Sequence, residues 1–153
     1  MKTRPGIVVI GLSFICFLLV SCGSKDQSES YLQKKLVNVS DINTYKYAVI
    51  LPSLGCQGCI STVEEFIKNN INRTEVLFIL TRIESLKMLQ NKIGIDVNKH
   101  SNVLIDLENK FLITSDNSIY PIVLELEEST IKSLYYISPK ADKSLIDIIT
   151  THD

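Results

Sequence analysis

Residues 47–69 read YAVILPSLGCQGCISTVEEFIKN, and this stretch decides the fold because it joins a strand, two cysteines and a helix. The run at 47–51 is continuously apolar, which is typical of a strand buried on both faces. Apolar residues then recur between 60 and 71 with the 3.6-residue period of a helix. Cys56 and Cys59 lie between the two elements. A CxxC pair at such a junction is the sequence pattern of a thiol–disulfide redox site.

The rest of the chain alternates strand and helix patterns, which predicts a partly parallel sheet with helices on its faces. Gly94 is placed as the C-cap of the second helix. Ser138 and Pro139 are suited to the N-cap and first turn of the last one. Residues 31–45 are ambiguous and include a candidate short strand at 36–39, while 111–113 could pair back on a neighbouring strand. We expect strands at 46–51, 75–80, 102–107, 121–126 and 130–137, and helices after the cysteine pair, at 84–93 and from 138 onward.

Length and charge exclude some classes of protein. The 153 residues suit one domain once a leader is set aside. The 16 basic and 17 acidic residues give a net charge of −1, so we expect no nucleic-acid partner.

The N-terminus has the pattern of a secretory signal peptide. Lys2 and Arg4 form a short basic start, and the apolar run at 7–20 follows. That run is shorter than the roughly 20 residues that a membrane-spanning helix requires. It matches the apolar region of a signal peptide instead.

The run ends in Leu19-Val20-Ser21-Cys22, which resembles the lipobox of bacterial lipoproteins. The resemblance implies that Cys22 carries acyl chains such as palmitate, becomes the first mature residue and anchors the protein to a membrane. We therefore divide the chain into a signal peptide at 1–21, a flexible polar tether at 22–30 and a folded domain at 31–153. Gly23, where enterobacterial inner-membrane lipoproteins have aspartate, favours the outer membrane. The alternative is an ordinary signal peptide with a chance cysteine.

The four cysteines then have separate fates. Cys16 leaves with the leader and Cys22 carries lipid, so only Cys56 and Cys59 remain as thiols. An exported compartment permits disulfides. The pair is therefore either redox-active or a structural staple.

The order of elements from 46 to 150 resembles the thioredoxin fold, with the CxxC before the first helix and a proline opening the later hairpin. The resemblance implies an α/β protein, a three-layer α/β/α sandwich whose central mixed sheet is flanked by helices. It also implies that Pro121, immediately before the hairpin, is a cis-proline beside the cysteine pair. The sequence departs from the family at Gly55, where tryptophan is usual, and at Gln57-Gly58, where Gly-Pro is usual. It departs again at Ile50, where many members have a buried acid that assists deprotonation.

A helix start at Cys56 places its sulfur near unsatisfied N–H groups and the positive end of the helix dipole, which favours the thiolate. Cys56 is then the nucleophile that attacks a disulfide, and Cys59, one turn deeper and more buried, is the resolving thiol. The resemblance assigns Pro121 to positioning the substrate backbone. The expected partners are protein thiols and disulfides on the periplasmic side of a bacterial envelope, and no cofactor is expected.

Three alternatives stay open. The domain is a redox-inert thioredoxin-like binding module with a structural disulfide, which the departures at 50 and 55 favour. The pair binds a metal, for which His100 and His152 are the only histidines. Or Cys56 forms a sulfenic acid in a peroxidase or peroxide sensor.

Overall fold

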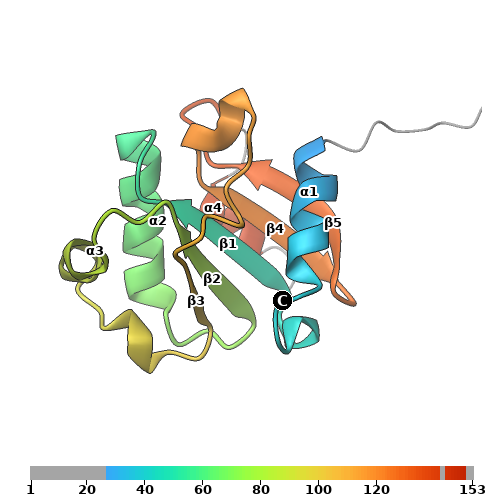
Figure 1. Cartoon of the computed structure of the whole chain (residues 1–153), viewed down its shortest axis with the longest axis horizontal. Coiled ribbons are helices and arrows are strands. Elements are labelled where there is room, and N and C mark those ends of the chain that lie inside the picture. Colours follow the sequence, from blue (N-terminus) through green and yellow to red (C-terminus); the bar gives the residue numbers. More distant parts are fainter. Residues whose placement is uncertain (1–26, 142–143, 151–153) are drawn as a thin grey trace, which may run out of the picture.

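The computed structural model describes residues 27–141 and 144–150. They form an α/β protein with a five-stranded mixed sheet, compatible with the thioredoxin-like α/β fold expected from the sequence (Figure 1). The described helices and strands are, in chain order, α1 (Gln27–Leu36), β1 (Tyr47–Pro52), α2 (Gln57–Asn70), β2 (Val76–Thr81), α3 (Leu86–Ile93), β3 (Val103–Asp106), β4 (Ile122–Glu127), β5 (Thr130–Tyr136) and α4 (Leu145–Thr150).

The sheet has the strand order β3-β2-β1-β4-β5. β1 pairs in parallel with β2, with Tyr47 opposite Val76, and β2 pairs in parallel with β3. β4 runs antiparallel to β1, with Ile122 opposite Ile50, and forms a hairpin with β5. The strand that leads into the cysteine pair is therefore the central one, as the apolar run at 47–51 predicts.

Alternate residues of the central strands enter two different hydrophobic clusters, which explains why their sequences are continuously apolar. In β1, Val49 and Leu51 pack with the apolar residues of α2, α3 and α4. Ala48 and Ile50 pack on the other face with α1 and with Phe111. Helices therefore contribute to both clusters, α2, α3 and α4 to the first and α1 to the second.

Helix α1 corrects the expected start of the domain. It begins at Gln27, so the last four residues assigned to the tether are helical, and no strand forms at 36–39. Leu32 and Leu36 are fully buried against the sheet. Gln33 fixes the position of the helix, since its side-chain amide donates to the Ser129 carbonyl and its oxygen accepts from the Ile131 amide. In this polar stretch of sequence, these two leucines are the main indication of a helix. The contacts of α1 with the distant β4–β5 hairpin stabilise the helix.

The last helix begins later than predicted. Ser138 and Pro139 lie in a turn, and α4 starts after Ser144. The Ser144 hydroxyl accepts from the Asp147 backbone amide at 3.1 Å, and the Asp147 carboxylate accepts from the Ser144 amide at 3.2 Å. These two bonds form a capping box, so the helix begins after Ser144 and not at the Ser138-Pro139 pair.

One smaller expectation also changes. Residues 111–113 are not a strand, although Phe111 and Ile113 are buried. Glu125 is only 8% exposed, although acidic side chains are seldom buried without a partner. Its carboxylate lies 2.9 Å from the ammonium of Lys132 on β5, and the hydrogen bond between them raises the pKa of Lys132. The Gly94 C-cap is confirmed, with φ of 78° and its amide bonded to the Gln90 carbonyl.

Among the described residues, no helix combines the length and the apolar character needed to cross a membrane. The predicted signal peptide, Cys22 and most of the predicted tether lie outside the described residues.

Candidate redox site

The cysteine pair lies between the end of the central strand and the first turn of the first long helix. β1 ends at Pro52, and Cys56 is the N-cap of α2. Cys56 and Cys59 form a disulfide with their Cα atoms 5.3 Å apart. The first backbone hydrogen bond of the helix runs from the Ile60 amide to the Cys56 carbonyl, 2.9 Å. The predicted placement of Cys56 at a helix start is confirmed.

The two sulfurs have unequal access to solvent. Cys59 is 6% exposed and belongs to the cluster beneath α2, whereas Cys56 is only partly buried. Gly58 is exposed and adds no side chain over the pair. A reacting group from outside therefore reaches Cys56 first, as the sequence predicts.

Gly55 permits a close backbone approach beside the disulfide. The Cys56 amide donates to the Ile119 carbonyl at 2.9 Å, which ties η3 (Asp116–Ile119) to the start of α2. Gly55 has a φ of 150°, and a Cβ built there would lie 2.2 Å from the Ile119 oxygen. No other residue fits this position without moving the loop.

Pro121 follows Ile119, whose carbonyl accepts from the Cys56 amide, by two residues, but it does not have the expected conformation. It is buried and directly precedes β4, whose first residue pairs with Ile50 near the end of β1. No peptide bond in the described residues is cis, so the Tyr120–Pro121 bond is trans and the cis prediction is wrong. The trans form is the intrinsically favoured one, by about 0.5–1 kcal/mol. A proline therefore directly precedes β4 as the sequence shows, but its peptide bond has the other isomer.

Ile50 is 2% exposed and sits in the cluster shared with α1. The position that holds a proton-accepting acid in many thioredoxin-like proteins is thus part of an apolar core. The described residues include no group of three or more histidine, cysteine, aspartate or glutamate side chains suited to a metal ion. His100 lies in a polar hollow with Tyr45 and Asn102, and His152 is outside the described residues.

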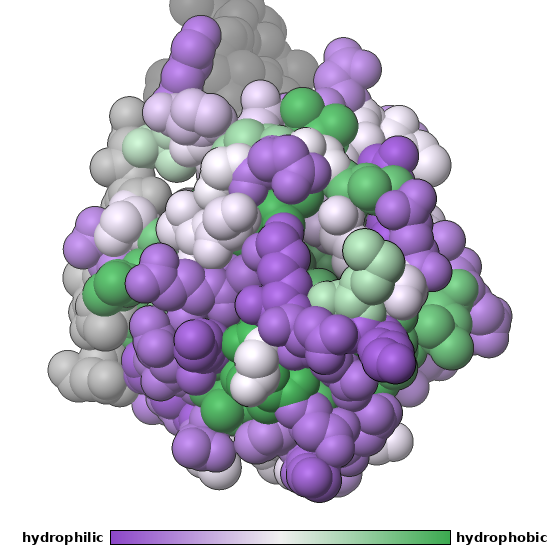
Figure 2. All heavy atoms as spheres, turned by 90° about the vertical axis from the view of Figure 1, so that its left-hand side faces the viewer, coloured by the Kyte–Doolittle hydropathy of each residue, from purple (hydrophilic) through white to green (hydrophobic). Residues whose placement is uncertain are grey.

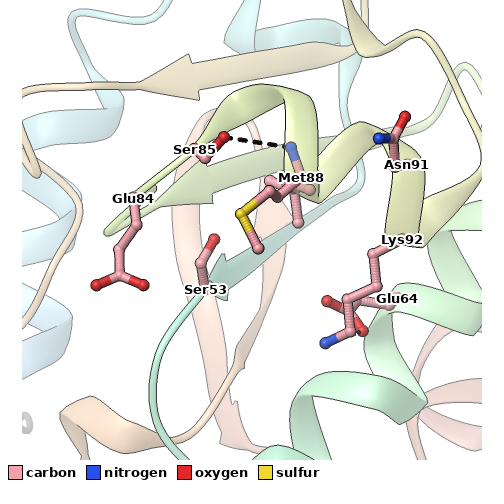
Figure 3. Close-up of a pocket in the computed structure, with 8 residues that line it drawn as sticks. Ser53, Glu64, Glu84, Ser85, Met88, Asn91 and Lys92 are labelled. Carbon is pink, nitrogen blue, oxygen red and sulfur yellow. Dashed lines mark hydrogen bonds and ion pairs between the residues drawn. The ribbon is translucent and has the colours of Figure 1, made fainter.

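A cavity of about 640 Å³ opens between α2 and α3, at the end of β1 (Figure 3). Sequence reasoning missed it because its walls come from three separate elements with no shared motif. Its lining includes Ser53, three residues before Cys56, and Met88 and Leu89 from α3. The side chain of Met88 extends toward Ser53 in the close-up (Figure 3).

Comparison with protein-family models, with curated proteins and with solved structures finds no match to this chain. What the site can do therefore follows from its own geometry. That geometry is a disulfide of CxxC spacing at a helix start, with one sulfur accessible and one buried, which is compatible with a redox disulfide.

Proposed function

We propose that the protein is a lipid-anchored, thioredoxin-like thiol–disulfide oxidoreductase of a bacterial envelope that uses Cys56 and Cys59 as its redox pair. The observation that carries the proposal is the disulfide at the start of α2, with Cys56 accessible and Cys59 buried. The two hydrophobic clusters on opposite faces of the sheet support the three-layer sandwich that this family has.

In the reducing direction, the Cys56 thiolate attacks a substrate disulfide. A bond forms between Cys56 and one substrate sulfur, and the other substrate sulfur leaves as a thiolate. The Cys59 thiolate then attacks the Cys56 sulfur, which restores the Cys56–Cys59 disulfide and releases the second substrate thiolate. Two electrons pass from the protein to the substrate. In the opposite direction, a substrate dithiol attacks Cys56 and is itself oxidised.

The start of α2 favours the thiolate of Cys56. The amides of Gln57, Gly58 and Cys59 precede the first intrahelical bond of α2, which the Ile60 amide donates. These N–H groups and the helix dipole stabilise negative charge at the N-cap position. The Cys56 amide itself is bonded to Ile119, so this donor orients the loop rather than the sulfur.

The anchor at Cys22 is part of the proposal, and the fold gives it a consequence. α1 begins at the same end of the sheet as the disulfide, because Gln33, near its other end, bonds to the β4–β5 hairpin at the opposite end (Figure 1). Four residues lie between Cys22 and Gln27, so the five steps of chain reach at most about 18 Å. A lipid on Cys22 then holds the disulfide end toward the membrane.

The second candidate is a redox-inert binding module, which the burial of Ile50 in an apolar core favours, since no acid assists Cys59 from that position. A redox titration separates the two. Thiol alkylation of the full chain across a glutathione and dithiothreitol series is expected to show a potential above about −300 mV. A pair that remains oxidised below that value is a structural staple.

Trapping supplies an independent test with a matched control. Cys59→Ser removes the thiol that resolves a mixed disulfide on Cys56, so mixed disulfides with envelope proteins should accumulate. Cys56→Ser leaves only the buried thiol and should trap none. If neither variant traps a mixed disulfide, the exchange function is contradicted.

The anchor is tested separately by fractionation. Cys22→Ala is expected to move the protein from the membrane to the soluble fraction while leaving the redox titration unchanged. Retention in the membrane would contradict lipidation at Cys22.

A further inference from the structure

The cavity between α2 and α3 contains a polar group that the folded chain does not satisfy. The Ser53 hydroxyl oxygen is buried and is the one such side-chain atom in the described part of the chain without a hydrogen-bond partner. An unsatisfied buried hydroxyl is destabilising, because it has lost its bonds to water and gained none in the protein. Such a group, on the wall of a cavity, marks a position where a ligand can supply the missing bond.

The apolar wall of the cavity is unusually exposed. Met88 is 72% exposed, although its neighbour Leu89 is 5% exposed. Methionine is flexible and polarizable, and it adapts to apolar groups of different shapes. The face that carries α3 is otherwise mostly hydrophilic, with apolar residues visible only in separate small areas (Figure 2). This distribution suits one apolar side chain rather than a broad apolar surface such as a membrane.

The charges around the cavity leave a net negative rim. Glu64 is 6% exposed and its carboxylate lies 2.8 Å from the ammonium of Lys92, so this pair is neutral overall. Glu84 is exposed and lines the same cavity, and the described residues give its carboxylate no ion-pair partner. A basic group on a ligand is therefore complementary to Glu84.

The cavity also lies close to the reactive sulfur. Ser53 precedes Cys56 by three residues, so their Cα atoms are at most about 11 Å apart. The Ser53 amide donates to the Thr81 carbonyl at 3.1 Å, which holds this short loop against the end of β2. A polypeptide whose cysteine reaches Cys56 can place a residue two to four positions away in the cavity.

We propose that this cavity is a substrate-recognition site for an extended polypeptide that carries an apolar side chain and an adjacent lysine or arginine near its reactive cysteine. The apolar side chain packs on Met88 and Leu89, the basic group faces Glu84, and a backbone group of the peptide bonds to the Ser53 hydroxyl. The inference rests on the proposed function and names the class of substrate for it.

The test uses the full chain with Cys59→Ser and disulfide-linked dimers of synthetic octapeptides. Attack by Cys56 forms one mixed disulfide and releases one peptide thiol, which is measured over time. A peptide with leucine and arginine beyond its cysteine is expected to react about tenfold faster than one with glycine and glutamate in those places.

Variants of the cavity residues test which side chains cause the preference for the leucine and arginine peptide. Met88→Asn is expected to abolish the part of the preference that leucine carries, whereas Leu107→Asn, at a side chain that is 71% exposed elsewhere, should not change it. Glu84→Lys should lower the rate of the arginine peptide relative to the glutamate peptide by about two- to fivefold. Glu65→Lys, an equivalent charge reversal on the exposed side of α2, is the matched control.

A binding measurement separates this inference from the redox function. The chain has two methionines, Met1 and Met88, and only Met88 lies in the chain that cleavage before Cys22 leaves, so a labelled methionine methyl group in the mature protein gives one signal. A peptide with serine in place of cysteine is expected to shift this Met88 signal. An unmoved Met88 signal, or equal rates for all peptides while Cys56 reacts with oxidised glutathione, overturns the recognition site. Failure of Cys56 to react with either glutathione or peptides overturns the proposed function, and this inference with it.

Discussion

Two buried polar groups at opposite ends of the parallel strands differ in how many hydrogen bonds the fold gives them. Asn102, just before β3, has its amide nitrogen 3.0, 3.0 and 3.2 Å from the carbonyl oxygens of Ile71, Arg73 and Val76. Ser53, just after β1 and beside the disulfide, has a buried hydroxyl with no partner in the described residues. The first arrangement joins elements and stabilises them, while the second leaves hydrogen-bonding capacity available next to a reactive group.

The largest effect is expected at Asn102. Asn102→Ala removes the donor to three backbone carbonyls and should lower the free energy of unfolding by about 2–4 kcal/mol. Urea denaturation measures the change. Asn98→Ala removes an exposed amide that bonds only to Asp96 and should stay within about 0.5 kcal/mol. Equal losses for both variants would contradict the role given to Asn102.

Gly55 is the next most sensitive position. Gly55→Ala places a Cβ against the Ile119 carbonyl at a positive φ, so we expect a loss of about 2 kcal/mol and a displaced loop at 116–121. Gly58→Ala is the control, because nothing lies within 4 Å of its Cβ position and alanine favours the helix. Thermal unfolding and the amide exchange rate of Cys56 report the two effects. A wild-type exchange rate in Gly55→Ala would show that the contact does not constrain the loop.

Acid stability tests the well-satisfied end of the sheet. Burial acts to raise the pKa of Glu75, but hydrogen bonds from its backbone and from Arg73 prevail and hold it below its ordinary value of 4.5. A lowered carboxyl pKa contributes stability above the pKa of the unfolded chain, and that contribution is lost as the pH falls through the folded value. Stability should therefore decline below about pH 4.5, and Glu75→Gln should remove up to about 1 kcal/mol of this dependence. Parallel pH curves for both proteins would contradict the assignment.

The smallest effect is expected at Ser53. Ser53→Ala removes a hydroxyl without a protein partner, so the free energy of unfolding should change by less than about 0.5 kcal/mol or increase. Denaturation beside Asn102→Ala tests the contrast directly. A loss above about 1 kcal/mol would mean that the hydroxyl is already satisfied in the folded protein.

The sequence predicts the central features of this fold because they depend on local pattern. The apolar runs that form β1 and β2 and the helical spacing of α2 are strong signals over short windows. The CxxC at the helix start is equally local, and the structure confirms it. Gly94 as a C-cap also follows from neighbouring residues alone.

The features that sequence reasoning missed depend on contacts between distant parts of the chain. α1 is a short polar helix whose stability comes from Leu32, Leu36 and the bonds of Gln33 to the β4–β5 hairpin. Glu125 is buried because Lys132 pairs with it across the hairpin. The cavity at Ser53 exists only when three elements meet. No window of sequence contains these partners together.

The close approach at Gly55 has a consequence for engineering. Thioredoxin-like proteins usually have tryptophan before the first cysteine, and a single substitution at residue 55 is the simplest way to introduce it here. The Ile119 carbonyl already occupies the space where that side chain would leave the backbone. Residue 55 and the loop at 116–121 therefore have to be redesigned together. A library that varies both should yield functional tryptophan variants that single substitution does not.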